Sequence, residues 1–388
     1  MKPWMVLLVS AALAGCATAP LPQRAEGLFH DRLFAAPSER IGADDLFALS
    51  PEMKEYLNAR ILPEVRGKGA PMALFDALYS KGQLKLEYDS TQTYNAAQAF
   101  NARSGNCLSL VIMTAAFAKE MNLPVTYQSA QLDETWGRSG DIHFFIGHVN
   151  VTLGPNQSVL NKKTNLVVRP QDNDLTIDFL LPREIRGLNT RVVDEQTIVA
   201  MYLNNRAAEA FVQGKLDDAY WWARAAIAQD PKFTSAYNTL GVIYRRHGNV
   251  QEAQRVLAYA MESSPKNTRV MSNMVLVLND LGLVSESQAL ARKLDEIEPN
   301  PPFSFFMEGM VAMRKGDYKT AKELFAREVA RAPYYHEFHF WLAAAYLGLG
   351  DTSRAEVQLT LAMDTSTSRN AHDLYAAKLN RIKSLEVQ

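Results

Sequence analysis

The sequence predicts an α+β domain followed by an all-α solenoid built from short repeats. The first half of the chain shows helical spacing of apolar residues up to about residue 121 and strand-like alternation after it. The second half has a period of 34 residues, which is shown by Gly214, Gly248, Gly282, Gly316 and Gly350. A chain of 388 residues is long enough for two such domains.

The N-terminus is typical of a bacterial export signal. Lys2 precedes an apolar run over residues 4–13, which is too short to cross a bilayer as a mature helix. The next residues, Leu13-Ala14-Gly15-Cys16, resemble the lipobox of bacterial lipoproteins, in which the cysteine is acylated and becomes the first mature residue. The alternative is an ordinary secretory signal that is cleaved near residue 17 or 19.

The lipobox resemblance implies a signal peptide over residues 1–15 and lipidation of Cys16. Residues 16–43 contain prolines and little periodicity, so we expect a tether from the membrane to the folded body. Ala17 follows the anchor in place of an aspartate, which by the same resemblance implies the outer membrane, facing the periplasm. The expected location is thus the bacterial cell envelope, and the lipid is the expected link to the membrane.

Composition excludes several classes of partner and cofactor. The 41 basic and 42 acidic residues give a net charge of −1, so no nucleic-acid partner is expected. The chain has no Cys-x-x-Cys or His-x-x-x-His pair for zinc. Asp172-Asn173-Asp174 is too short for a calcium loop. We therefore predict neither a metal nor a cofactor.

The periodic half resembles the tetratricopeptide repeat, a helix–turn–helix unit. Prolines recur in phase with the glycines, and Tyr237-x-x-Leu240-Gly241-x-x-Tyr244 has the aromatic–Leu–Gly–Tyr pattern of the repeat. One unit cannot bury its apolar face alone, so neighbouring units must stack. We expect five units within residues 191–369, followed by a capping helix over 370–388. The units cover about 200–233, 234–267, 268–301, 302–335 and 336–369.

The repeat resemblance implies a concave groove that binds a protein or a peptide. The candidate groove residues are Asn204, Asn238 and Asn273, with His339 as a further candidate, all on the first helix of a unit. A side-chain amide both donates and accepts hydrogen bonds, which suits a peptide backbone. The alternative is that these are solvated polar residues.

The preceding domain, residues 44–190, begins with helical spacing over about 44–58 and 71–82. Ser50-Pro51 is typical of a helix start, and Thr93 or Asn95 could cap a short helix through Phe100. A longer helix begins at Cys107 and is apolar on nearly all sides, so we expect it to be buried. Strands are expected over 124–128, 142–153, 166–168 and 175–179, in an antiparallel sheet.

The thiol is the candidate centre of the chemistry. Cys107 ends the motif Arg103-Ser104-Gly105-Asn106-Cys107, where the positive end of a helix dipole favours thiolate. His148 opens an alternating strand, and Asp178 lies near the end of the last one. This order resembles the transglutaminase-like (papain-like) cysteine superfamily over roughly residues 70–185. Family members often carry a tryptophan soon after the histidine, where this chain has Asn150.

The resemblance implies that Cys107 is a nucleophile, His148 its base and Asp178 the group that orients the histidine. Its reactions would be those of a peptidase, an amidase or an acyl-transferase. The oxyanion would be held by the Cys107 N–H and a second donor, either Gln98 or Asn106. The alternative function is a catalytically retired scaffold that assembles envelope proteins through its repeats.

Each member of this set has a competitor in the sequence. Cys107 could be a buried core cysteine, since free cysteine is among the most buried residue types. His143 competes with His148, but the regular alternation after His148 suits a strand-opening base better. The competitors of Asp178 are Asp172 and Asp174, which lie in a polar segment. We therefore favour Cys107, His148 and Asp178, and the enzyme over the scaffold.

Overall fold

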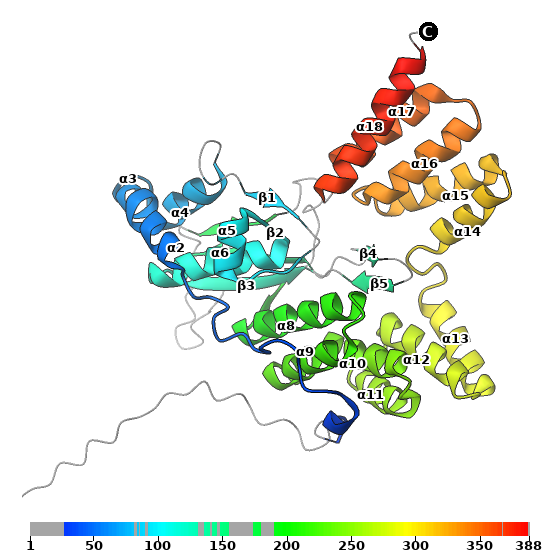
Figure 1. Cartoon of the computed structure of the whole chain (residues 1–388), viewed down its shortest axis with the longest axis horizontal. Helices are drawn as coiled ribbons and strands as arrows, with labels where there is room; N and C mark the ends of the chain where they lie inside the picture. Colours follow the sequence, from blue (N-terminus) through cyan, green and yellow to red (C-terminus); the bar gives the residue numbers. More distant parts are fainter. Residues whose placement is uncertain are drawn as a thin grey trace, which may run out of the picture.

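In the computed structural model, an α+β domain is followed by a curved stack of helix pairs (Figure 1). The structure describes residues 27–80, 84, 86–89, 92–130, 136–139, 142–145, 148–154, 174–179, 190–366 and 368–386. Among these residues, no helix is long and apolar enough to cross a bilayer. Cys16 and the predicted signal peptide lie outside the described residues.

Short helices form the first layer of the α+β domain. Ser50 caps the first of them by accepting a hydrogen bond from the Met53 N–H, with Pro51 at the first helical position, as the sequence predicts. Asn95, not Thr93, caps the helix that ends near Phe100, in a capping box. The helices and turns are α2 (Pro51–Tyr56), η2 (Leu57–Ile61), η3 (Leu62–Glu64), α3 (Val65–Lys68), α4 (Ala70–Tyr79), α5 (Ala96–Ala102) and α6 (Cys107–Glu120).

Helix α6 is the central helix of this domain. Every residue from Cys107 to Ala118 is buried, as its apolar surface predicts. The helix contacts α4 and α5 and also strand β6 (His148–Leu153). Its first residue is therefore fixed between the helical layer and the sheet.

The main sheet has four antiparallel strands in the order β7-β6-β3-β8. Strand β3 (Val125–Ala130) pairs with β6 on one side and with β8 (Thr190–Val193), which the sequence did not predict, on the other. Strand β7 (Leu175–Ile177) pairs with the other edge of β6 and ends directly before Asp178. The register therefore brings Asp178 to the polar face of β6.

One predicted strand is wrong in its extent. The expected strand over 142–153 is divided between β5 (Ile142–Phe145), which forms a hairpin with β4 (Trp136–Ser139), and β6 in the main sheet. A two-stranded parallel pair, β1 (Glu87–Tyr88) with β2 (Ser104–Gly105), lies just before α6. The strand expected over 166–168 lies outside the described residues.

Five helix pairs and a last helix make up the solenoid. Within a pair, the helices cross at small residues: a Cβ at Gly241 would lie 2.7 Å from Leu257. Val275 holds the position of Gly241 in the third pair, and the hydroxyl of Ser287 on the second helix of that pair donates to its carbonyl. The helices are α8 (Glu195–Val212), α9 (Leu216–Gln229), α10 (Thr234–His247), α11 (Val250–Ser263), α12 (Thr268–Asp280), α13 (Val284–Ile297), α14 (Ser304–Arg314), α15 (Tyr318–Arg331), α16 (His336–Gly348), α17 (Thr352–Asp364) and α18 (Arg369–Glu386).

The solenoid does not share one continuous hydrophobic core. The core of the α+β domain continues through the buried residues of α8–α12, and a separate core begins at Phe303. The segment 298–303 between α13 and α14 contains Pro299, Pro301 and Pro302. Large apolar side chains stay exposed on both sides of it, including Ile297 and Met307. Helix α18 packs at the far end through Leu379 and Ile382.

The described part of the predicted tether is a docked strap, which we define as residues 28–39. Phe34 stacks on Tyr220 with ring centroids 4.0 Å apart, and the Ser38 N–H and hydroxyl donate to Asp218 of α9. Tyr244 of α10 donates to the Leu28 carbonyl. The strap thus lies across α9 and α10, where aromatic partners bury Phe34.

Candidate functional site

The start of α6 is built by local sequence. Asn106 is the N-cap of this helix, and its Oδ1 accepts hydrogen bonds of 2.9 Å from both the N–H and the hydroxyl of Ser109. Only glycine leaves room at position 105, because a Cβ there would lie 2.7 Å from the Ser109 Cβ. Cys107 is therefore held in the first turn, at the positive end of the helix dipole, with 3% of its surface exposed.

His148 and Asp178 form a buried pair on neighbouring strands. The distance from His148 Nε2 to Asp178 Oδ1 is 2.7 Å, and the side chains are 2% and 9% exposed. Asn150, two residues along β6, donates from Nδ2 to the other carboxylate oxygen at 3.0 Å. The Asp178 carboxylate is thus fixed by two donors on the same face of the strand. Sequence reasoning missed the role of Asn150, although its alternation with His148 was visible.

The Cys107 side chain also interacts with the ring of His148 and helps to raise its pKa. Because Nε2 faces Asp178, the other ring nitrogen, Nδ1, is the one left for the sulfur. Burial alone lowers the pKa of His148, but the hydrogen bonds to Asp178 and Cys107 outweigh it and raise the pKa to about 9. The structure therefore brings together Cys107, His148 and Asp178 in a chain in which the imidazole is charged near neutrality.

The two candidates for a second oxyanion donor, Gln98 and Asn106, both make hydrogen bonds at the N-terminus of a helix. Gln98 Oε1 accepts the Asn95 N–H in the capping box of α5. Asn106 Nδ2, the donor group of that side chain, hydrogen-bonds to Thr93 Oγ1 at 2.9 Å. The Cys107 N–H is at the first helical position of α6, on the same residue as the sulfur. It remains the best-placed donor of the three.

The competing residues lie elsewhere. His143 is on β5, in the separate hairpin, opposite Arg138 in the register. Asp174 is exposed just before β7. Asp172 lies outside the described residues. Of the candidate histidines and aspartates in the described residues, His148 and Asp178 are the two that contact each other.

The predicted groove residues lie on the first helices of three successive pairs. Asn273 of α12 donates to Asn238 of α10 at 2.8 Å, so these two amides form a ladder. Asn204 of α8 has a buried Oδ1 that finds no partner within the described part of the chain. His339 lies instead in the core, where its ring bonds to Gln358 and to the Pro333 carbonyl. It is therefore not available to a ligand.

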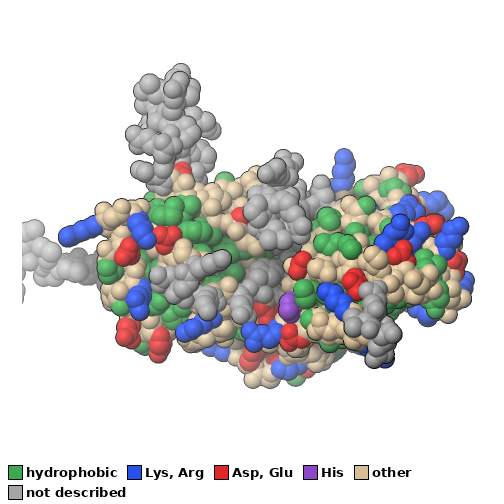
Figure 2. All heavy atoms as spheres, turned by 90° about the horizontal axis from the view of Figure 1, so that it is seen from above, with side chains coloured by type: hydrophobic (Ala, Val, Ile, Leu, Met, Phe, Trp, Pro, Cys, Tyr) green, Lys and Arg blue, Asp and Glu red, His purple; other side chains and the backbone are tan. Residues whose placement is uncertain are grey.

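The charge distribution matches the balanced composition. Lys and Arg side chains are interspersed with Asp and Glu over the face in Figure 2. The described residues contain no group of three or more His, Cys, Asp or Glu side chains placed to hold a metal ion.

Comparisons with known proteins identify the repeats. Residues 222–255 and 306–369 each match a tetratricopeptide repeat family. No curated protein matches the chain. These matches confirm the predicted repeats, which belong to a class of module that binds peptides or proteins.

Solved structures of repeat proteins are also similar to part of this chain. YrrB, a TPR protein with an unusual peptide-binding site, is 20% identical, with 46% of this chain and 92% of that chain covered and a TM-score of 0.25. TTC0263, a TPR protein from Thermus thermophilus, is 16% identical, with 46% and 98% covered and a TM-score of 0.31. MamA from Desulfovibrio magneticus RS-1 is 14% identical, with 44% and 96% covered and a TM-score of 0.26. The family matches and the helix pairs themselves establish the second half of this chain as tetratricopeptide repeats.

Proposed function

We propose that this protein is a lipid-anchored enzyme of the bacterial cell envelope that cleaves or transfers acyl groups at peptide or amide bonds. The observation that carries the proposal is the His148 ring, which hydrogen-bonds to Asp178 and interacts with Cys107. A nucleophile, a base and a group that orients the base are the three parts that thiol acyl transfer needs. The transglutaminase-like resemblance supports the same assignment.

In the first step, the Cys107 thiolate attacks the carbonyl carbon of the substrate. The resulting oxyanion accepts hydrogen bonds from the Cys107 N–H and a second donor, for which Gln98 and Asn106 stay candidates. His148 then gives its proton to the leaving amine, and the carbon–nitrogen bond breaks. A thioester on Cys107 and a neutral imidazole remain.

In the second step, His148 takes a proton from water or from an acceptor amine, which attacks the thioester. The carbon–sulfur bond breaks, and the thiolate–imidazolium pair is restored. Water yields a carboxylic acid, whereas an amine yields a new amide. Throughout, Asp178 fixes the orientation of the imidazole and stabilises its charged form, and Asn150 fixes Asp178.

The repeats would bring the substrate to this site. Asn238 and Asn273 form a ladder of amides on successive first helices, and Asn204 of α8 has a buried Oδ1 without a partner in the described residues. Lipidation at Cys16 would hold the whole protein at the membrane, with the outer membrane as the expected site. The strap would then connect the anchor to α9 and α10, at the start of the solenoid.

The test is the rate at which iodoacetamide alkylates Cys107 in protein that lacks residues 1–16. Because His148 lies beside the sulfur and can take its proton, we expect Cys107 to react faster at pH 7 than an ordinary thiol. In His148→Ala, the rate should be lower and should rise about tenfold per pH unit, as for an ordinary thiol. His372→Ala, an exposed histidine on α18, is the matched control and should behave as the wild type.

The same experiment decides between enzyme and scaffold. The burial of Cys107 and His148, which are 3% and 2% exposed, is the observation that favours a retired site. If the wild type alkylates with the rate and pH dependence of His148→Ala, the enzyme is excluded, and a scaffold that assembles proteins through its repeats is left. A thioester that forms on Cys107 with an activated acyl donor, and is absent from Cys107→Ala, would establish the first chemical step.

A further inference from the structure

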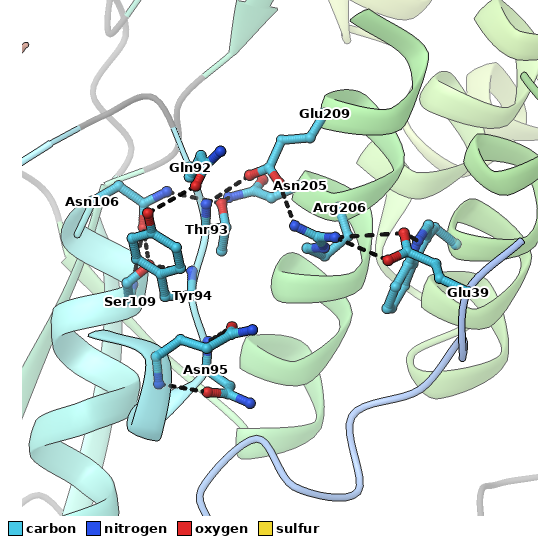
Figure 3. Close-up of polar contacts among 12 residues, drawn as sticks. Glu39, Gln92, Thr93, Tyr94, Asn95, Asn106, Ser109, Asn205, Arg206 and Glu209 are labelled. Carbon is cyan, nitrogen blue, oxygen red and sulfur yellow. Dashed lines mark hydrogen bonds and ion pairs between the residues drawn. The ribbon is translucent and has the colours of Figure 1, made fainter. Parts of the chain in front are cut away.

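Thr93 lies between the start of α6 and the first repeat helix, α8 (Figure 3). Its side chain is 1% exposed, and its Oγ1 accepts hydrogen bonds from both directions. Asn106 Nδ2 donates to it at 2.9 Å from the α6 side, and Asn205 Nδ2 donates at 3.3 Å from α8. The sequence predicted Thr93 only as a candidate helix cap, a position that Asn95 takes.

On the α6 side, Thr93 accepts a hydrogen bond from Asn106, the N-cap residue of the helix. Asn106 uses its oxygen to cap α6 and its nitrogen to hold Thr93, so both ends of the amide are fixed. The next backbone N–H, that of Tyr94, donates to Ser109 Oγ at 2.8 Å, which ties the same segment to the first turn of α6 a second time. Cys107 lies between Asn106 and Ser109 in this turn. A shift of Thr93 would therefore shift the sulfur.

On the α8 side, Thr93 is held by a buried carboxylate. Its N–H donates to Glu209 Oε1 at 2.7 Å, and Arg206 Nη1 pairs with Glu209 Oε2 at 2.8 Å. Burial raises the pKa of the Glu209 carboxyl, and Arg206 and Thr93 oppose this. Arg206 continues to Glu39 of the strap at 3.5 Å, which Trp222 Nε1 also contacts. The network thus joins the α+β domain, the first repeat and the strap.

We propose that Thr93 is a positioning residue for the Cys107 reaction, through which α8 of the first repeat fixes the first turn of α6. This inference rests on the proposed function. Its physical basis is that reacting groups displaced by about 1 Å can lose on the order of a hundredfold in rate. Asn205 and Glu209, which hold Thr93, belong to the first repeat. The position of the Cys107 sulfur in the α+β domain therefore depends on the solenoid. Neither the superfamily resemblance nor the repeats alone imply this dependence.

The test compares alkylation of Cys107 by iodoacetamide in the full chain without residues 1–16. Thr93→Val removes the hydroxyl and keeps the shape, so the rate at pH 7 should fall about tenfold, as expected for the loss of one or two hydrogen bonds. The pH profile should keep the shape of the wild-type profile, because the contact of His148 with Asp178 is intact. Thr93→Ser, which restores an acceptor, should return the rate to within about twofold of the wild type.

Thr114→Val is the matched control. Thr114 is equally buried and is on α6, and its hydroxyl donates to the Leu110 carbonyl two turns after Cys107. Its loss should lower the thermal midpoint as much as Thr93→Val does, without changing the alkylation rate. If Thr93→Val does not fold, Glu209→Gln tests the same contact from α8. This substitution keeps an acceptor for the Thr93 N–H but removes the charge, so the alkylation rate should fall about threefold.

The outcomes separate the two proposals. A wild type that reacts as an ordinary thiol overturns the proposed function, and this inference with it. If the wild type reacts fast and Thr93→Val reacts equally fast, the inference alone is overturned. If Thr93→Val does not fold, an equally fast Glu209→Gln has the same meaning. Equal losses in Thr93→Val and Thr114→Val would also overturn it, because general loosening of α6 would then explain both.

Discussion

Replacing Asp178 by asparagine should lower the pKa of His148 by about 2 units. The substitution keeps the shape of the side chain and its contact with Asn150 but removes the negative charge 2.7 Å from Nε2. In the wild type the pKa is raised from 6.5 to about 9, which corresponds to about 3 kcal/mol in favour of the charged ring. In the variant the ring is still buried, which favours its neutral form. The charged ring should therefore lose most of the free energy that favours it in the wild type.

The sign of the effect on stability follows from the direction of the shift. A pKa that is higher in the folded state stabilises the fold fully below the unfolded value, near pH 6.5. This contribution is lost as the pH rises through about 9. The free energy of unfolding of the α+β domain should therefore fall by about 3 kcal/mol over this window in the wild type, and by much less in Asp178→Asn.

The assay is an NMR titration of protein labelled with ¹³C at the histidine Cε1 positions. The chain has 7 histidines, and His148→Gln assigns the resonance of His148. A wild-type midpoint near 6.5, or the same midpoint in wild type and Asp178→Asn, would refute the assignment of Asp178 as the group that charges the ring. His372→Ala should leave the His148 midpoint unchanged.

Two further substitutions test the packing of the solenoid. Phe34→Ala removes the ring stacked on Tyr220, so the strap should open more easily by about 3 kcal/mol, and tryptic cleavage within it should be roughly a hundredfold faster. Gly241→Val adds atoms where a single Cβ already lies 2.7 Å from Leu257, which should cost about 3 kcal/mol and lower the thermal midpoint by roughly 8 °C.

Controls exist for both substitutions. Leu33→Ala changes a side chain in the strap that is 39% exposed, and should leave the cleavage rate within about twofold. Gly67→Val adds a side chain where a Cβ meets nothing within 4 Å, and should change the midpoint little. Unchanged cleavage in Phe34→Ala would mean that the strap is not held by its aromatic contact. An unshifted midpoint in Gly241→Val would mean that the helices of this pair separate at no cost.

The features that the sequence predicted are local or periodic. The cap at Ser50, the helix start at Cys107 and the 34-residue period depend on neighbours within one or two turns or on repetition. Strand β8 was missed because Thr190-Arg191-Val192-Val193 has no clear alternation, and its pairing with β3 decides its conformation. The single strand expected over 142–153 rested on the alternation of apolar and polar residues after His148, which cannot show that its two parts pair with different strands.

The parts of the site that the sequence missed depend on distant contacts. Thr93 meets Glu209, which is 116 residues away, and Phe34 meets Tyr220 across 186 residues. No periodicity connects such positions. His148 and Asp178 could be paired from the superfamily resemblance and from their order and spacing. The contact of Asn150 with Asp178 depends on the register of β6 with β7.

The interruption at residues 298–303 separates a block that contains Cys107 and the first three repeats from a distal block with two cores of its own. The distal cores begin only at Phe303. In a linear array, each block responds to heat or to denaturant according to its own nearest-neighbour contacts. Damage to the last two repeats should therefore melt that end of the solenoid and leave Cys107 and its partners in place. Sequence change can accumulate in the distal repeats without disturbing the contacts around Cys107.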